Sequence, residues 1–276
     1  MILIYAYGSG LGHLKRVISF LKRQKYNPEN CILLTNAKFS DFWELGWNIM
    51  QKEDLFFSSE EFLSFIENVI SENNVHTFMV DVFPTGFYGE LSTSLIHFQG
   101  EKILLSRILS NCYFEKNPNI LYFDQIFVME EGVNLSQLHY GRIRYLDYQE
   151  NISEEISITI EPSYFLIIHS QPLSEVLHLY RLAKMYRTNQ KVVILTATVI
   201  SQENIKPKDL VLYQQKPSQS LLDKAEKIFS GAGFNTFHML IPYHKKWICN
   251  PFPRTFDDQF LRKDIYYKKV KYLHKD

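Results

Sequence analysis

Short apolar runs alternate with segments of helical periodicity along the first half of the chain. A run that is apolar at nearly every position is typical of a strand buried on both faces, whereas apolar residues three and four positions apart indicate one face of a helix. Such runs predict strands at 2–7, 31–36, 77–83, 102–108 and 125–130. Helical spacing follows the first strand at Leu14, Val17, Ile18 and Leu21, and an amphipathic segment covers 60–72. This order predicts a parallel sheet with helices on both faces.

The pattern lapses over 147–163, an acidic and polar stretch with a proline near its end, and then a second series begins. It predicts strands at 164–170, 191–197, 210–215, 227–231 and 247–252, and helices at 173–187, 218–225, 233–241 and from about 257. We therefore predict an α/β protein of two doubly wound, Rossmann-like domains facing across a cleft, residues 1–155 and 156–276. One variant of this prediction has the last helix packing back on the first domain.

Composition narrows the class of protein. A chain of 276 residues, 46% of them hydrophobic, is long enough to bury roughly three quarters of its unfolded surface. Lys plus Arg and Asp plus Glu number 30 each, so no overall field attracts nucleic acid, and an anion site has to be built locally. Three widely spaced cysteines without a CxxC pair predict a reducing, cytoplasmic setting. We find neither a signal-peptide pattern nor a run of about 20 apolar residues.

Three glycines and a histidine follow the first predicted strand. Gly8, Gly10 and Gly12 lie between the strand and the helical run, and His13 comes directly after them. Such a turn lets a ligand approach the backbone amides at a helix N-terminus. His13 occupies the third glycine position of the GxGxxG fingerprint, and the second strand ends near Asn36 without an acidic residue, which disfavours an NAD-dependent enzyme. The alternative is that the glycines only permit a tight turn and His13 caps the helix.

Asp81 ends a predicted strand and precedes a turn-rich segment, 83–90, that closes on Glu90. The carboxyl end of that strand lies at the same sheet edge as the first glycine turn, so Asp81 is placed to orient His13 or to meet an acceptor, and Glu90 likewise. The alternative is that Asp81 caps the following turn.

Two further motifs lie in the second half. Residues 229–240 repeat the pattern of a strand, a Gly-Ala-Gly turn and a helix, with Asn235 or Thr236 as the expected N-cap. Residues 249–263 contain a proline-rich loop and then Asp258 and Gln259 at the start of the last predicted helix. A carboxylate and an amide suit vicinal sugar hydroxyls. The alternative is that Asp257 and Asp258 are ordinary acids in the first turn of the last helix.

Four motifs occur in the order of one known family: GSGLGH at 8–13, IIHSQP at 167–172, SGAGFNTF at 230–237 and PFPRTFDDQF at 251–260. On these motifs the chain resembles the GT-B glycosyltransferases, especially the glycosyltransferase family 28-like branch that includes the peptidoglycan N-acetylglucosaminyltransferase. The resemblance implies a transferase that uses neither a metal nor a cofactor and moves a sugar from a nucleotide-diphosphate donor, expected to be a UDP-sugar, to a hydroxyl acceptor.

The resemblance also implies roles for particular residues. His13 is the expected base, with Asp81 beside it, and the acceptor-side loop comprises Gly8, Ser9, Gly10, Gly12 and Glu90. The expected donor-binding residues are His169, Ser170, Gln171, Gln214, Gln215, Ser230, Ala232, Gly233, Asn235, Thr236, Asp258 and Gln259.

Two departures from the family leave an alternative open. Met239 stands where the family has an acidic residue on the donor ribose, and His169 stands where a glycine is usual. A protein that keeps the fold and binds a nucleotide or sugar without turnover is the second hypothesis.

The tail at 262–275 mixes lysine with tyrosine. This pattern predicts either contact with an anionic membrane surface that carries a lipid-linked acceptor, or the solvated face of a terminal helix. The expected location is cytoplasmic, with peripheral membrane contact in the first case.

Overall fold

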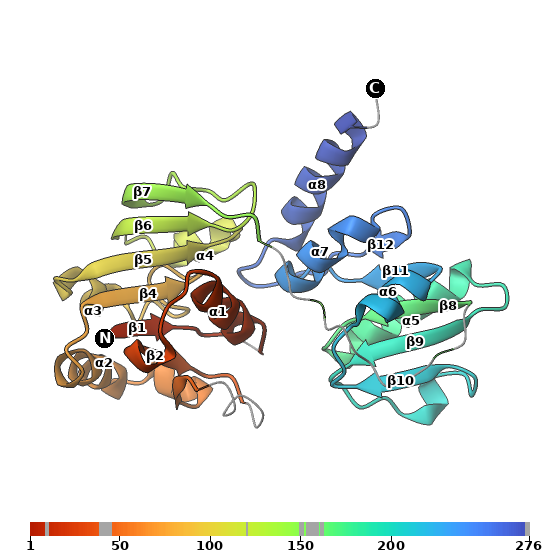
Figure 1. The fold of residues 1–276 in the computed structure, drawn as a ribbon, viewed down its shortest axis with the longest axis horizontal. Helices are drawn as coiled ribbons and strands as arrows, with labels where there is room; N and C mark the ends of the chain where they lie inside the picture. Colours follow the sequence, from red (N-terminus) through yellow and green to blue (C-terminus); the bar gives the residue numbers. More distant parts are fainter. Residues whose placement is uncertain are drawn as a thin grey trace. The chain divides into compact units, whose positions relative to one another are not determined.

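The computed structural model describes residues 1–8, 11–38, 46–119, 121–148, 152, 160 and 163–273 (Figure 1). The chain forms two compact units. Unit 1 comprises Met1–Asp147 and Thr255–Asp257, and unit 2 comprises Tyr148–Arg254 and Asp258–Asp276. The predicted domain boundary, between 155 and 156, lies outside the described residues.

Unit 1 contains a seven-stranded sheet in the order β3-β2-β1-β4-β5-β6-β7, with every neighbouring pair parallel. Its strands are β1 (Ile2–Tyr5), β2 (Cys31–Thr35), β3 (Asn48–Gln51), β4 (Thr77–Asp81), β5 (Glu101–Ser106), β6 (Tyr122–Val128) and β7 (His139–Tyr145). Its helices are α1 (Leu11–Arg23), α2 (Glu61–Glu72), α3 (Ser92–His97) and α4 (Asn111–Lys116), with 3-10 turns at Pro28–Asn30 and Asp54–Ser58.

The central strands of unit 1 form where the apolar runs predict them. Every residue of β1, β2 and β4 is buried, because helices cover both faces of the sheet. On α1, the four predicted core positions, Leu14, Val17, Ile18 and Leu21, are all buried. Helical periodicity therefore places one face of α1 against the sheet and fixes where its first turn lies relative to β1.

The two edge strands of unit 1 are not among the predicted strands. β3 and β7 are exposed or half-buried at every position, and β7 carries the polar sequence HYGRIRY. An edge strand covered on few sides needs no apolar run, so the signal that identifies β1 is missing here.

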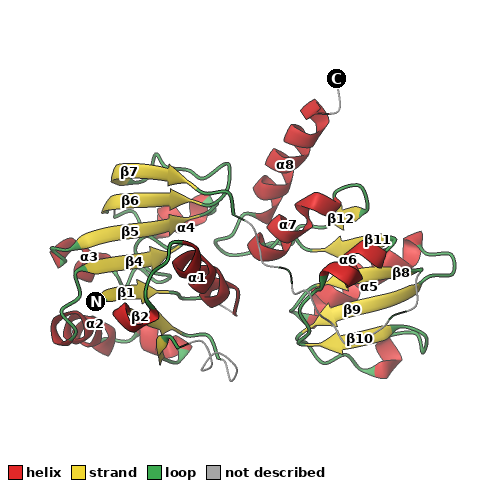
Figure 2. Ribbon diagram, in the orientation of Figure 1, coloured by secondary structure: helices red, strands yellow, loops and turns green. Residues whose placement is uncertain are grey.

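Unit 2 contains a five-stranded parallel sheet in the order β10-β9-β8-β11-β12. Its strands are β8 (Tyr164–Ile168), β9 (Lys191–Thr196), β10 (Leu210–Tyr213), β11 (Lys227–Ser230) and β12 (Trp247–Cys249). Its helices are α5 (Leu173–Tyr186), α6 (Gln219–Lys224), α7 (Phe234–Leu240) and α8 (Gln259–Leu273), with 3-10 turns at Gln202–Asn204 and Ile241–Tyr243 (Figure 2).

Successive residues of β8 pack on opposite faces of this sheet. Leu166 and Ile168 join the apolar cluster of α6 and α7, whereas Phe165 and Ile167 join the cluster of α5. The sheet is therefore covered by helices on both sides. Two such doubly wound sheets in one chain confirm the predicted α/β fold class.

Candidate functional site

Parallel pairing brings the first glycine turn and Asp81 to one edge of the unit 1 sheet. β1 pairs with β4 in the register Tyr5 with Val80, so both strands end at the same edge. Gly8 follows β1, and Gly12 and His13 lie in the first turn of α1. Ser9 and Gly10 lie outside the described residues.

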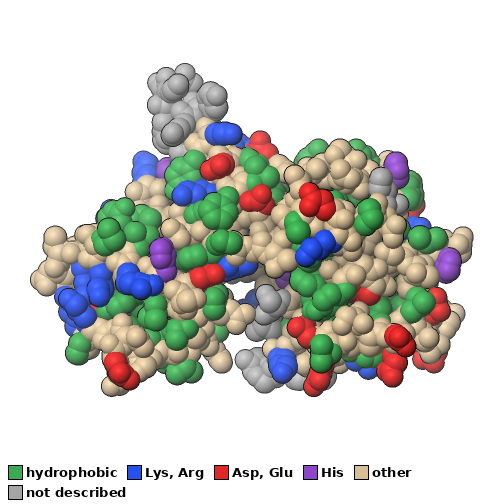
Figure 3. Space-filling model, turned by 180° about the vertical axis from the view of Figure 1, so that it is seen from behind, with side chains coloured by type: hydrophobic (Ala, Val, Ile, Leu, Met, Phe, Trp, Pro, Cys, Tyr) green, Lys and Arg blue, Asp and Glu red, His purple; other side chains and the backbone are tan. Residues whose placement is uncertain are grey.

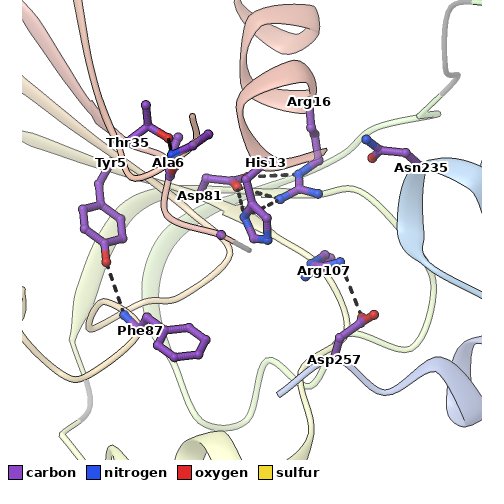
Figure 4. Close-up of polar contacts among 12 residues, drawn as sticks. Tyr5, Ala6, His13, Arg16, Thr35, Asp81, Phe87, Arg107, Asn235 and Asp257 are labelled. Carbon is purple, nitrogen blue, oxygen red and sulfur yellow. Dashed lines mark hydrogen bonds and ion pairs between the residues drawn. The ribbon is translucent and has the colours of Figure 1, made fainter. Parts of the chain in front are cut away.

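His13 and Asp81 are in direct contact at this edge (Figure 4). The imidazole Nδ1 lies 2.7 Å from the carboxylate oxygen Oδ2. The Asp81 side chain is fully buried, and 14% of the His13 side chain is exposed. The prediction that Asp81 lies beside His13 therefore holds in the structure, whereas the chemical roles of the two residues stay predictions.

Arg16 completes the cluster and was not among the predicted residues. Its Nε donates to Asp81 Oδ1 over 3.0 Å and its Nη2 donates to Oδ2 over 2.6 Å, so the guanidinium binds both carboxylate oxygens. Only 2% of the Arg16 side chain is exposed. The sequence signal was the spacing of three between His13 and Arg16, which places both side chains on one face of α1.

Burial and charge act in opposite directions on the two titrating groups. Burial lowers the pKa of His13 most, the positive charge of Arg16 lowers it further, and contact with Asp81 only partly offsets these effects, so the pKa of His13 is about 4. Burial alone raises the pKa of Asp81, but the charge of Arg16 and the hydrogen bond from His13 outweigh it and lower the pKa to about 2. Near neutral pH the cluster therefore holds a carboxylate, a guanidinium and an uncharged imidazole.

The contacts also define the tautomer of His13. An ionised Asp81 only accepts hydrogen bonds, so a separation of 2.7 Å from Oδ2 requires the proton to be on Nδ1. The Nη2 atom of Arg16 lies 3.1 Å from Nδ1 because both groups converge on the same oxygen. Nε2 then keeps its lone pair and, as Figure 4 shows, points away from Asp81. An imidazole in this state accepts a proton at Nε2.

Packing holds the ring in place from two sides. The Phe83 ring stacks on the imidazole with centroids 5.7 Å apart and an interplanar angle of 19°. Gly8 lies against the ring edge, and a Cβ added at Gly8 would meet His13 Cδ2 at 2.1 Å and Nε2 at 2.7 Å. Gly8 is therefore required by the imidazole that packs against it.

Gly8→Ala is expected to reduce any turnover that depends on His13 by roughly 100-fold, because a displacement of about 1 Å is enough to misalign a reacting group. The overlap falls on the ring edge that carries Nε2, and the Asp81 contact and Phe83 limit how far the ring can move. Turnover and melting temperature are measured together. Undiminished turnover in the folded variant would contradict this arrangement.

Acid is expected to destabilise the fold through His13 by about 2 kcal/mol between pH 7 and pH 5. In the unfolded chain His13 has its ordinary pKa of 6.5 and binds a proton below that pH, whereas the folded form stays neutral down to about pH 4. The unfolded state binds more protons in this window, so stability falls as pH falls; above pH 6.5 both states are neutral. Denaturant unfolding at the two pH values, compared with His13→Asn, measures the difference. An equal pH dependence in both proteins would contradict the prediction.

Glu90 is engaged elsewhere. Its carboxylate accepts hydrogen bonds from the Tyr5 hydroxyl and, over 2.8 Å, from the backbone N–H of Tyr88. Burial raises the pKa of Glu90. In the described contacts Asp81, and not Glu90, orients His13, while the acceptor role of Glu90 stays a prediction.

A pocket of about 340 Å³ opens in unit 1 near this cluster. It is lined by Phe87, Tyr88, Lys116, Asn117, Thr255 and Phe256. Phe83, which stacks on His13, also contacts Phe87 and Phe256, with centroids 5.1 and 6.1 Å apart. One aromatic side chain therefore lies between the imidazole and the residues that line the pocket.

In unit 2, a second histidine pairs with a carboxylate at the end of β8. His169 Nε2 lies 2.7 Å from Glu175 Oε2, and Arg254 binds both oxygens of Glu175 at 2.6 Å. Burial lowers the pKa of His169. Gly231 lies against this ring, since an added Cβ would meet His169 Cε1 at 3.0 Å. The structure thus places His169 beside the second glycine turn, while Ser170 and Gln171 are exposed.

Three of the predicted donor-binding residues hold unit 2 together. The Ser230 hydroxyl accepts from Trp247 Nε1 over 2.9 Å. Gln259 Oε1 accepts from the backbone N–H groups of Ala232 and Phe252, each over 3.0 Å. The Gln259 amide therefore ties the glycine turn to the proline loop.

The expected helix caps differ from those observed. Gly233, and not Asn235 or Thr236, is the N-cap of α7, because the helix begins at Phe234 and takes both polar residues into its first turn. Asp258 Oδ1 accepts from the Leu261 N–H over 2.9 Å and so caps α8. This contact agrees with the alternative that Asp258 is an acid at the start of a helix.

The remaining residues of unit 2 that the sequence singled out differ in exposure. Gln214 and Gln215 are exposed after β10, and Gln214 has a left-handed φ of 56°. Met239 is 6% exposed and packs in the core with α7, so this position presents no polar atom to a ligand.

Two negative findings apply to the described part of the chain. Within it, no three His, Cys, Asp or Glu side chains are grouped so as to bind a metal ion. Its helices also include none with the length and apolar character needed to cross a bilayer.

The fold is that of the GT-B glycosyltransferases. The chain is similar to MurG of Acinetobacter baumannii, with a TM-score of 0.54 and 11% identity over 98% of this chain and 83% of that one. It is similar to the calicheamicin glycosyltransferase CalG4, with a TM-score of 0.58 and 10% identity over 97% and 83%. It is also similar to UDP-GlcNAc 2-epimerase of Methanocaldococcus jannaschii, with a TM-score of 0.50 and 11% identity over 98% of this chain and 92% of that one. No protein-family model and no curated protein matches the sequence. These similarities confirm the predicted fold.

Proposed function

We propose that this protein is a glycosyltransferase that moves a sugar from a nucleotide-diphosphate donor to a hydroxyl acceptor, with His13 as the base. The observation that carries the proposal is the contact of 2.7 Å between His13 Nδ1 and the buried Asp81 carboxylate. It leaves Nε2 as a proton acceptor on an uncharged ring, which is what removal of a hydroxyl proton near neutral pH requires.

In the proposed step the acceptor hydroxyl gives its proton to Nε2 while its oxygen bonds to the anomeric carbon of the donor sugar. The bond from that carbon to the diphosphate oxygen breaks, and its electron pair leaves with the nucleoside diphosphate. The imidazolium that forms keeps its hydrogen bond from Nδ1–H to Asp81 Oδ2, which holds the ring in place during the transfer. The pocket lined by Phe87, Tyr88 and Phe256 is the proposed acceptor site.

Unit 2 is proposed to bind the donor. It carries 18 Lys and Arg against 12 Asp and Glu, whereas unit 1 carries 12 against 18, so the excess positive charge lies on the unit proposed to bind a diphosphate. On the face drawn in Figure 3, Lys and Arg side chains (blue) and Asp and Glu side chains (red) lie among apolar ones (green). Ser170 and Gln171 precede the 14-residue helix α5, whose N-terminal amides suit an anion.

The finer assignments rest on the sequence motifs. We propose a UDP-sugar as the donor and transfer without a metal ion, in which helix N-termini and side chains stabilise the departing diphosphate. The proposed location is cytoplasmic, with peripheral membrane contact if the acceptor is lipid-linked.

The test is a screen of nucleotide sugars in two stages. Binding of UDP, other nucleoside diphosphates and their sugars is measured by thermal shift and calorimetry, and release of the nucleoside diphosphate is then measured with and without EDTA. Binding with turnover that persists in EDTA supports the proposal. Loss of turnover in EDTA would contradict metal independence, and no binding by any nucleotide would contradict the proposal as a whole. Binding without turnover on any acceptor would favour the second hypothesis, a binding protein, for which the buried Met239 is the motivating observation.

A further inference from the structure

The Asp81 carboxylate is shared between two side chains of α1, and this sharing acts together with burial to keep His13 uncharged. A carboxylate touching an imidazole ordinarily favours the protonated ring, because the opposite charge stabilises it. Here Arg16 satisfies the same carboxylate with two hydrogen bonds of 3.0 and 2.6 Å. The imidazole therefore faces an ion pair of no net charge, in a site where Asp81 and Arg16 are almost completely buried.

We propose that Arg16 is a positioning residue that, through Asp81, keeps His13 uncharged with its proton on Nδ1 and the lone pair on Nε2. The inference deepens the proposed function and rests on it for its biological meaning, since a base has to enter the reaction unprotonated. The protonation state of His13 itself is a property of the protein without substrate.

Geometry and charge make separate contributions. The guanidinium fork uses Oδ1 and Oδ2 together, so it fixes the plane of the carboxylate and leaves Oδ2 directed at Nδ1–H. The positive charge disfavours a second positive charge on the ring 3.1 Å away. A neutral residue at position 16 would supply neither effect, whereas lysine would supply the charge without the fork.

A second arginine, Arg107, also acts on the charge of His13. Arg107, which follows β5, acts in the same direction as Arg16 but more weakly. Its Nη1 lies 3.5 Å from Asp257 Oδ1, so part of its charge is balanced there. Arg16 is therefore the side chain whose removal changes the charge balance at the imidazole most.

The test is nitrogen-15 NMR of the histidine rings in the full-length protein, with the His13 signals assigned by their loss in His13→Asn. Wild type is expected to show a protonated Nδ1 and an unprotonated Nε2 at pH 6.5, and to titrate near pH 4. In Arg16→Met the titration midpoint is expected to rise by two or more pH units, or the proton to move to Asp81 with inversion of the tautomer. Either change abolishes the wild-type pattern. Lys22→Met, which removes one exposed positive charge from the same helix, is the matched control and should leave the signals unchanged.

A His13 pattern in Arg16→Met identical to wild type would overturn the inference. If Arg16→Met does not fold, Arg16→Lys carries the test: it keeps the charge, so the midpoint should stay within one pH unit of wild type, and a larger rise would overturn the role of charge. No substrate enters the measurement. Failure of nucleotide-sugar turnover would therefore leave the NMR result standing, and an unchanged NMR pattern would leave the proposed function standing.

Discussion

His13→Ala is expected to lower the rate of sugar transfer by about 10²- to 10⁴-fold, the usual contribution of a positioned general base. The imidazole provides the only proton acceptor that the cluster offers near neutral pH, because the Asp81 carboxylate is buried and occupied by Arg16 and His13. Substrate binding should change much less than the rate. The measurement is kcat and KM for the donor identified by the nucleotide screen, with the melting temperature recorded alongside.

His97→Ala is the matched control, since His97 is an exposed histidine at the end of α3 in the same unit. It should retain wild-type rates. A loss of similar size in both variants would mean that the effect is not specific to the cluster, and a His13→Ala enzyme with an unchanged kcat would remove His13 from the mechanism.

The acid limb of the pH–rate profile separates His13 from an ordinary histidine. Burial and Arg16 hold the pKa of His13 at about 4, so the rate in wild type should stay level from pH 8 down to about pH 5. A histidine without these neighbours would lose activity below pH 6.5.

Much of the fold follows from the sequence because burial leaves a pattern. β1 and β8 are apolar at every position since both faces are covered, and the four predicted core residues of α1 lie at helical spacing. β3 and β7 lie at the sheet edge, where side chains meet solvent and no pattern is imposed. Edge strands follow only from knowing which strand they pair with.

Some residues of the candidate site could likewise be predicted from the sequence, and others could not. His13 and Asp81 were predictable because His13 follows the glycine turn after β1, Asp81 ends β4, and parallel strands end at one edge. Arg16 was missed because an arginine following a lysine on an amphipathic helix indicates a solvated face, and only the buried carboxylate opposite it makes this one a core residue. Gly8 illustrates the converse: the sequence indicates a turn open to a ligand or simply a tight turn, while the structure shows a glycine required by the ring beside it.

Arg16→Met and Asp81→Asn are each expected to destabilise the fold by about 3–5 kcal/mol, because each leaves a buried charge without its partner. Against a typical total stability of about 5–15 kcal/mol, a loss of this size lowers the unfolding midpoint in denaturant substantially. The double variant Arg16→Met/Asp81→Asn should lose clearly less than the sum of the single losses, since it leaves neither charge buried alone.

Denaturant unfolding of the four proteins completes this double-mutant cycle. Lys22→Met, on the exposed side of α1, should change stability by less than about 0.5 kcal/mol. Strictly additive losses would mean that Arg16 and Asp81 do not interact in solution. The His13 imidazole would then face an unneutralised carboxylate, and Arg16 would no longer help burial to keep it uncharged. A coupling of several kcal/mol would instead show that the ion pair serves both stability and chemistry, because the same two hydrogen bonds that hold α1 to β4 help burial to keep the imidazole uncharged.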